Sequence, residues 1–411
     1  MRITNTTATK RRIRTSSYFE WCCNTAPDVK REFHRLFFNI QKDEKRNAIL
    51  AIKNMWDIRP KNEREHWNRP WPYAAAHALK CVKFIEKISI ADKEMFLGKY
   101  GSTATPIAMT GKAIQDGYGR FGDAVAALGG DLLLAAGETA EMTFTIAIGD
   151  NPESVMKTID VLAAQPASQT LAAARNFWNN LLTRTKVSSQ SEDFDLLNNC
   201  WLPYQAISGR LWGRTGYYQQ SGAFGFRDQL QDSQVFLPID PDQCKKQIKL
   251  HAVRQFTDGS VYHWWHALAD FGNHTACSDD YLWLPFVVAA YLRETGDYGI
   301  LDEVLPFVDD LKGATLKEHC RRSIARTFKR TSERGLPHIG SCDWNDGLSA
   351  MGIDEKGESV WLAMFLCNIL DQWETILSHL EHHHNRDQEE NHTLAAHYHA
   401  MRLAYAAAIN E

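Results

Sequence analysis

The spacing of apolar residues changes near Asp150, from a period of two to a period of three or four. Before that point, Ala140–Ala147 alternates apolar and polar residues, which is typical of a half-buried β-strand. Apolar segments on both sides of the charged stretch Gln41–Asn47 predict a β-hairpin. We therefore interpret residues 1–149 as an N-terminal β-sandwich domain.

After Asp150 the pattern becomes helical. Asn151 is a suitable N-cap, Pro152 suits the first helical turn, and Val155, Ile159 and Leu162 recur on one face. A second helix is expected from about Ala167. We interpret 150–190 as a helical linker.

The rest of the chain, 191–411, is expected to be a series of helices separated by long loops. The predicted helices are Asp193–Leu211, Asp242–Gln255, Asp280–Glu294, Ile300–Leu311, Leu316–Lys329, Val360–His379 and His392–Ile409. Helical pairs without strands between them indicate stacked helical hairpins rather than a parallel α/β sheet. In such a fold the chemistry is expected on the loops at one end of the helices.

Composition narrows the classes of partner. The chain of 411 residues has a formal net charge of −4, which does not favour nucleic acid or an anionic membrane surface. Its longest apolar run, Leu282–Leu292, is too short to cross a bilayer, and no apolar segment of a signal peptide follows the basic residues Lys10–Arg12. Nine cysteines without a CxxC pair suggest a reduced, cytoplasmic protein in which zinc and disulfide frameworks are not expected.

The stretch with most chemical content is Cys342–Leu348, followed by Lys356–Trp361. It places Asp343, Trp344, Asn345 and Asp346 in succession. An indole face covers the apolar side of a pyranose, amides and carboxylates bind its hydroxyls, and one carboxyl group can donate a proton. The alternative is a plain turn, because Asn-Asp-Gly is a common turn signal.

Two further clusters accompany it. Phe224–Asp232 combines Arg227 with carboxylates that include Asp232, and it could bind an anion or sugar hydroxyls, or simply hold a loop by an Arg–Asp pair. Asp258–His266 contains two histidines three residues apart, expected on a helix, where a stacking wall is favoured over a metal site because no third ligand stands out. Ser278–Asp279 is compatible with a plain N-cap.

Together these stretches resemble the inverting β-glycoside phosphorylases of glycoside hydrolase family 94, which include cellobiose and chitobiose phosphorylases and a module of cyclic β-1,2-glucan synthases. The motifs that carry the resemblance are Phe224–Asp232, Asp258–His266, Ser278–Pro285, Thr295–Asp297 with Leu301–Glu303, Asp343–Gly347 and Lys356–Trp361. The resemblance implies a fold of an N-terminal β-sandwich, a helical linker and an (α/α)6 barrel.

The resemblance also implies a mechanism, in which Asp346 is the general acid and inorganic phosphate attacks the anomeric carbon of a β-linked gluco-oligosaccharide to give α-glucose 1-phosphate. Phosphate is then a co-substrate, and no cofactor or metal is expected. Arg227 and Asp232 would hold the sugar, with Arg227 also facing phosphate, and Trp344 and Asn345 would line the site. Asp343 and Glu358 are further predicted substrate-binding residues. We expect partial burial or the neighbouring Asp343 to keep the Asp346 carboxyl protonated.

Family members are considerably longer. They carry a further half-barrel, which supplies a His and a Thr-Gly pair for phosphate, and are often dimers, so a homodimer is compatible with the resemblance. We expect the chain to be a fragment, incomplete at its start, that forms part of the barrel, leaves apolar helix faces exposed and turns over slowly.

Three alternatives stay open. One is an inverting (α/α)6 hydrolase that uses Glu358 or Asp343 as base. The second is a sugar-binding protein without activity, and the third is a piece of a larger glucan synthase. The acceptor sugar is not fixed by the sequence.

Overall fold

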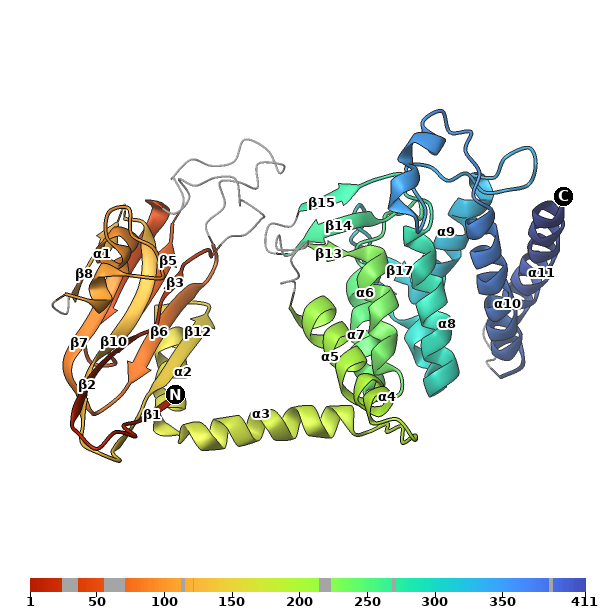
Figure 1. Cartoon of the computed structure of the whole chain (residues 1–411). Helices are drawn as coiled ribbons and strands as arrows, with labels where there is room; N and C mark the ends of the chain where they lie inside the picture. Colours follow the sequence, from red (N-terminus) through yellow and green to blue (C-terminus); the bar gives the residue numbers. More distant parts are fainter. Residues whose placement is uncertain are drawn as a thin grey trace. The chain divides into compact units, whose positions relative to one another are not determined.

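The computed structural model describes residues 1–23, 36–54, 71–111, 115–120, 122–213, 223–267, 271–383 and 387–411. The chain divides into two compact units, Met1–Phe177 and Trp178–Glu411 (Figure 1). Helix α3 (Ala167–Leu182) crosses that boundary, inside the segment predicted as a linker. The two units are described separately below.

The first unit is built mainly of strands. They are β1 (Arg2–Thr4), β2 (Arg11–Ser16), β3 (Phe19–Glu20), β4 (Phe38–Asp43), β5 (Ala48–Lys53), β6 (Ala74–Lys80), β7 (Phe84–Asp92), β8 (Gln115–Asp116), β9 (Gly119–Arg120), β10 (Ala124–Leu134), β11 (Thr139–Glu141) and β12 (Thr143–Gly149), with a short helix α1 (Lys93–Leu97). The predicted hairpin is confirmed as β4 and β5, which pair antiparallel.

These strands form the two layers of a sandwich. One sheet has the order β2-β10-β7-β8, with β3 also on β10, and the other has the order β12-β6-β5-β4-β9. Side chains from both sheets share one buried core, including Ile40 and Ile49 from one and Leu128 and Leu132 from the other. Burial of these apolar side chains between the sheets is the main favourable contribution to folding of the unit.

Helix α2 (Pro152–Ala164) covers the outer face of the second sheet. Its Val155 and Ile159 pack with alanines of β5, β6 and β12. The predicted cap is confirmed: Oδ1 of Asn151 accepts a hydrogen bond from the amide of Ser154 at 2.9 Å.

The second unit is mainly helical. Its longer elements are α4 (Glu192–Leu196), α5 (Leu202–Gln205), α6 (Phe226–Ser233), α7 (Pro241–Ala252), α8 (Trp283–Thr295), α9 (Leu316–Lys329), α10 (Val360–His383) and α11 (Gln388–Asn410). α-Helix α4, a π-helical turn over Leu197–Trp201, α5 and a second π-helical stretch over Ala206–Trp212 follow one another without a break. No helix among the described residues has the length and apolarity needed to cross a membrane.

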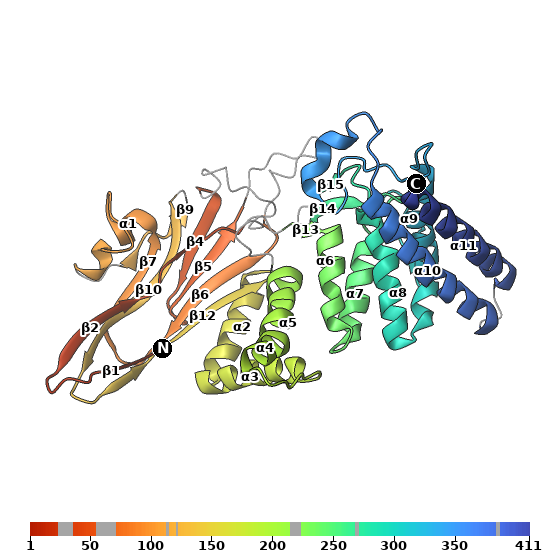
Figure 2. The same ribbon diagram turned by 45° about the vertical axis from the view of Figure 1, so that its right-hand side comes forward.

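The helices from α6 to α11 pack as neighbours over one continuous apolar core. Both views place the small sheet of β13 (Phe224–Gly225), β14 (Tyr262–His266) and β15 (Phe271–His274) at the same end of these helices as the segment that precedes α10 (Figures 1 and 2). The site described below lies at this end. The predicted succession of a β-sandwich and a helical domain is therefore confirmed.

Two predictions about local structure are wrong. The helix expected over Ile300–Leu311 is a 3-10 turn, Tyr298–Asp302, followed by the short strand β16 (Val304–Leu305), which pairs with β17 (Ala314–Thr315). Pro306 disfavours helical backbone at the residue before it. The histidines at 263 and 266 lie on strand β14 rather than on a helix, and His263 stands at a register shift of that strand.

Candidate active site

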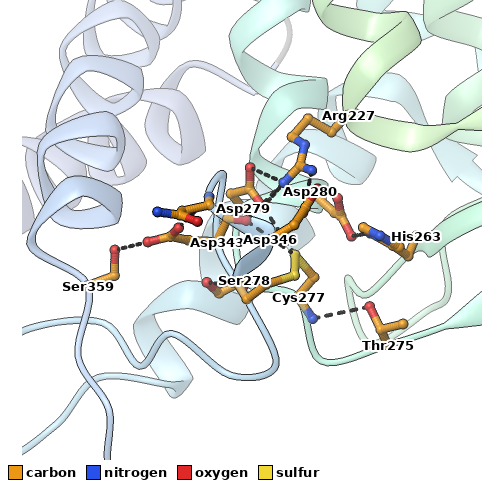
Figure 3. The surroundings of a disulfide bond; sticks show 12 residues. Arg227, His263, Thr275, Cys277, Ser278, Asp279, Asp280, Asp343, Asp346 and Ser359 are labelled. Carbon is orange, nitrogen blue, oxygen red and sulfur yellow. Dashed lines mark hydrogen bonds and ion pairs between the residues drawn. A yellow bond between two sulfur atoms is a disulfide. The ribbon is translucent and has the colours of Figure 1, made fainter. Parts of the chain in front are cut away.

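Three loops meet at the N-terminal ends of α6, α8 and α10. Arg227 lies in the first turn of α6, Asp279 and Asp280 immediately precede α8, and the Cys342–Asp346 loop reaches the start of α10 through Ser359 (Figure 3). The three motifs that contribute, Phe224–Asp232, Ser278–Pro285 and Asp343–Gly347, were singled out from the sequence, and the structure brings them together.

Arg227 links the three loops. Its Nη2 donates to Oδ1 of Asp346 at 2.7 Å, and its Nη1 donates to the carbonyl oxygen of Asp343 at 2.9 Å and to both carboxylate oxygens of Asp279 at 3.3 Å (Figure 3). The Arg227 side chain is 9% exposed. The cluster around Arg227 was predicted on a loop, but a short helix carries it, which fixes the guanidinium more firmly.

The electrostatics of this cluster depend on burial. Burial alone would lower the pKa of Arg227, but the charges of Asp279, Asp280 and Asp346 outweigh it and hold the pKa above its usual value. Burial raises the pKa of Asp279 and of Asp280, with the neighbouring negative charge adding to the effect at Asp279. The pKa of His263 is raised by its hydrogen bond to Asp280.

Asp343 shapes the loop rather than facing solvent. It is 5% exposed; its Oδ1 accepts from the amide of Asn345 at 2.8 Å and its Oδ2 from the hydroxyl of Ser359 at 2.6 Å. The same hydroxyl oxygen of Ser359 accepts from the amide of Leu362 at 3.0 Å and so caps α10. Asn345 in turn accepts from the amide of Gly347, at 3.1 Å. This stretch is therefore also a turn, as the alternative interpretation predicted, and the turn positions the side chains of Trp344 and Asp346.

Asp346 and Trp344 are the exposed members of the loop. The Asp346 side chain is 68% exposed and Trp344 is 53% exposed. Asp346 thus lacks the burial that we expected for an acid. The Trp344 ring lies 6.4 Å from that of Trp361, and Trp361 stacks on Phe365 at 5.3 Å, so a row of aromatic faces adjoins the carboxyl group. Such faces suit the apolar side of a pyranose.

Asp232 and Glu358, two other predicted site residues, form separate ion pairs. Asp232 accepts from Nε of Arg210 at 2.6 Å. Glu358 accepts from Nε of Arg334 at 3.0 Å, and this hydrogen bond lowers the pKa of Glu358. Both roles in sugar binding stay predictions.

The cysteines require a correction. Cys277 and Cys342 form a disulfide, although the sequence led us to expect none. They are separated by 65 residues, a spacing without any signature, and the fold alone brings them together. Cys277 also bridges to Gly340, whose φ of +63° and close approach to the backbone of Ala276 leave no room for a side chain. The two loops of the site are therefore joined both covalently and through the backbone.

Asp279, Asp280 and His263 lie in motifs that were singled out from the sequence, Ser278–Pro285 and Asp258–His266, but they were given no role in the site. A plain N-cap was one interpretation of Ser278–Asp279, but Asp279 makes no side-chain cap and instead accepts from Arg227 and, at 3.0 Å, from Nε1 of Trp283. Two adjacent carboxylates before a largely apolar helix were the available signal, because carboxylates are rarely buried without a partner.

Comparison with known proteins decides the family. The model of the glycosyl hydrolase 94 superfamily catalytic domain matches residues 177–404, and that of the glycosyl hydrolase 94 supersandwich domain matches residues 1–164. The chain belongs to glycoside hydrolase family 94. The family recognition made from sequence is confirmed.

The curated relatives of this chain include a glucan synthase and phosphorylases. The cyclic β-(1,2)-glucan synthase NdvB of Rhizobium meliloti is 34% identical over 398 residues, which cover 90% of this chain and 13% of the synthase. Solabiose phosphorylase of Paenibacillus borealis is 28% identical over 289 residues, covering 68% of this chain and 35% of that enzyme. The family 94 chain thus spans a small part of the length of these relatives.

A solved structure supports the fold. A putative kojibiose phosphorylase from the human microbiome superposes with a TM-score of 0.53 at 9% identity, over 98% of this chain and 50% of that one. With the family match, this confirms the predicted class of a β-sandwich followed by helices of an (α/α)6 barrel. Further relatives that the chain matches are also named phosphorylases.

Proposed function

We propose that this site phosphorolyses a β-linked gluco-disaccharide or oligosaccharide with inversion, with Asp346 as general acid and inorganic phosphate as nucleophile. A phosphate oxygen forms a bond to the anomeric carbon while the glycosidic C–O bond breaks. The proton of Asp346 passes to the departing sugar oxygen. The products are α-glucose 1-phosphate and a sugar shortened by one unit.

The contact between Arg227 and Asp346 carries this proposal. It places an accessible carboxyl group beside a buried guanidinium whose planar N–H groups suit phosphate or sugar hydroxyls. The exposed rings of Trp344 and Trp361 provide the stacking surface next to it. Phosphate arrives as an anion, so one acid is enough for the reaction.

A hydrolase needs a second carboxylate to deprotonate water. Both carboxylate oxygens of Asp343 already accept hydrogen bonds, and Glu358 is held by Arg334. These engagements favour phosphorolysis over the rival in which Asp343 or Glu358 acts as base.

The relatives suggest which sugars to test. The name of NdvB contains a β-(1,2)-glucan and those of other relatives contain disaccharides, so a panel should include sophorose, cellobiose and cellobionic acid. We expect sugar 1-phosphate to form only when inorganic phosphate is present. Free glucose formed at the same rate without phosphate would favour hydrolysis instead. Saccharide binding with no turnover of any panel member would support the binding-protein reading.

A further inference from the structure

Two adjacent buried carboxylates hold two different cationic side chains beside Asp346. Asp279 is fully buried and accepts from Arg227, as described above. Asp280 is 2% exposed, and its Oδ2 lies 2.7 Å from Nδ1 of His263 (Figure 3). Asp279 thus orients Arg227, and the next residue, Asp280, orients His263. Arg227 belongs to the proposed mechanism, whereas His263 has no role in it.

His263 is held in one orientation. An ionised carboxylate only accepts hydrogen bonds, so Nδ1–H of His263 donates to Asp280, and Nε2 is left as the second functional atom of the ring. Nε2 makes no hydrogen bond within the described part of the chain, and a quarter of the side chain is exposed. The remaining carboxylate oxygen of Asp280 is buried without a partner there, so the local charge is not fully compensated.

His263 lies close to the proposed reaction centre. A ring nitrogen of His263, a carboxylate oxygen of Asp280 and Sγ of Cys277 all lie within 4.8 Å of one another, and Cys277 is bonded to the loop that carries Asp346. The charges of both Asp346 and Arg227 act on the imidazole. His263 lies at a bulge of strand β14, between Tyr262, which pairs with His274 of β15, and Trp264, which pairs with Gly225 of β13.

We propose that His263 is a second anion-binding residue of this site, and that its Nε2–H and the guanidinium of Arg227 together bind inorganic phosphate. The inference rests on the proposed phosphorolysis and names a residue that binds its co-substrate. A phosphate dianion needs more than one cationic donor in a partly buried site. Arg227 alone does not supply this, because the buried Asp279 already balances its charge and its Nη2 donates to Asp346. The imidazolium, favoured by Asp280, provides a second donor within the described residues, in addition to the His and the Thr-Gly pair that the family resemblance implies.

The test is calorimetric titration of inorganic phosphate and, separately, of a β-linked gluco-disaccharide into the wild type and His263→Asn. The Asn side chain keeps an N–H near the position of Nδ1 for Asp280 and removes Nε2. We expect phosphate affinity to fall about tenfold or more and disaccharide affinity to change by less than about twofold. His399→Asn is the matched control, because His399 forms the same kind of pair with Glu374, at 2.9 Å, on the surface of α10 and α11.

Equal phosphate affinities of the wild type and His263→Asn would overturn the inference, as would a wild type that binds no phosphate. A loss confined to disaccharide affinity would also overturn it and make His263 a sugar contact. Melting temperatures of the two variants show whether His263→Asn is folded. If it is not, NMR of the imidazole signals of the wild type decides, since inorganic phosphate should shift the His263 signals and leave those of His399 in place.

Failure of the inference is distinguishable from failure of the proposed function. If the wild type forms sugar phosphate and His263→Asn has an unchanged KM for phosphate, the proposed function holds but His263 does not bind the phosphate. If the wild type binds phosphate through His263 but cleaves its substrate equally well without phosphate, the anion site holds and the proposed phosphorolysis is wrong.

Discussion

Nη2 of Arg227 lies 2.7 Å from Oδ1 of Asp346, while Nη1 of the same guanidinium contacts the fully buried Asp279. One buried cation thus joins an accessible carboxyl group to the core of the helical unit. The expected consequences for activity and stability differ between the two carboxylates, and they can be measured separately.

Replacing Asp346 by Asn removes the proposed acid. We expect phosphorolysis to fall by about 10²- to 10⁴-fold, the usual contribution of a general acid, while stability changes little because the side chain is mostly exposed. Initial rates of sugar phosphate formation and the melting temperature check this. Asp354→Asn, at an exposed position of the same segment, is the control and should keep the wild-type rate. Wild-type activity in Asp346→Asn would exclude Asp346 as the acid.

Asp279→Asn should act on stability as well as activity. Removing one partner of a buried pair leaves Arg227 under-compensated, and we expect a loss of about 3 kcal/mol in the free energy of unfolding of the helical unit. Denaturant titration followed by circular dichroism measures it. Asp228→Asn breaks the pair of Asp228 with Arg210, in which both side chains are about one third exposed, and should cost less than about 1 kcal/mol. Equal losses of unfolding free energy in Asp279→Asn and Asp228→Asn would show that the buried pair stabilises the helical unit no more than the exposed pair does.

Trp344→Ala tests the stacking surface. We expect disaccharide affinity to fall about tenfold, because an exposed indole face contributes about 1 kcal/mol or more on a sugar, while phosphate affinity stays unchanged. Trp201→Ala is the control: Trp201 is exposed to a similar degree but lies in the helical segment before α6. If both variants bind the disaccharide equally well, Trp344 does not stack on it.

The disulfide predicts a redox-dependent stability. Closing the 65-residue separation between Cys277 and Cys342 should contribute about 4 kcal/mol through the unfolded state. Alkylation of the denatured protein, compared by mass spectrometry with and without reductant, should show two additional thiols after reduction, and unfolding of Cys277→Ser/Cys342→Ser should need less denaturant. Cys200→Ser, at a free cysteine, should unfold like the wild type. No difference in thiol count would mean that the bond is absent.

The sandwich has its own pH dependence. Asp131 is 1% exposed, and its hydrogen bond with Arg14, followed by that with Arg12, lowers the pKa of the carboxyl to about 2. Because this pKa lies below the unfolded value of about 3.9, its contribution of about 2 kcal/mol is complete above that pH and is lost as the pH falls towards 2. Asp131→Asn should lower the stability of the sandwich at neutral pH and flatten its decline in acid. Asp160→Asn, which breaks the exposed pair with Arg46, should change the profile less, because water screens that pair.

The sequence predicted those parts of the fold that local patterns determine. Helix α9 was predicted with the bounds that the structure gives it, Leu316–Lys329, because its apolar period is regular and the helix starts at a capping threonine. The helix predicted after Ile300 is wrong because the apolar period continues through a proline, which ends the helical backbone.

The site was predicted only as far as its motifs are contiguous. Trp344, Asn345 and Asp346 follow one another in the chain, so their association was visible. The contacts of Arg227 with Asp279 and of His263 with Asp280 join residues 52 and 17 positions apart, which only tertiary folding brings together. The exposure of Asp346 was also unpredictable, because it depends on how the loop lies on the N-terminal ends of the helices.

The most direct test of phosphorolysis is NMR identification of the first product formed from a β-linked gluco-disaccharide, with and without inorganic phosphate. The account predicts α-glucose 1-phosphate as the first product, formed only with phosphate and strongly reduced in Asp346→Asn. Free glucose as the first product, at a rate independent of phosphate, would contradict it.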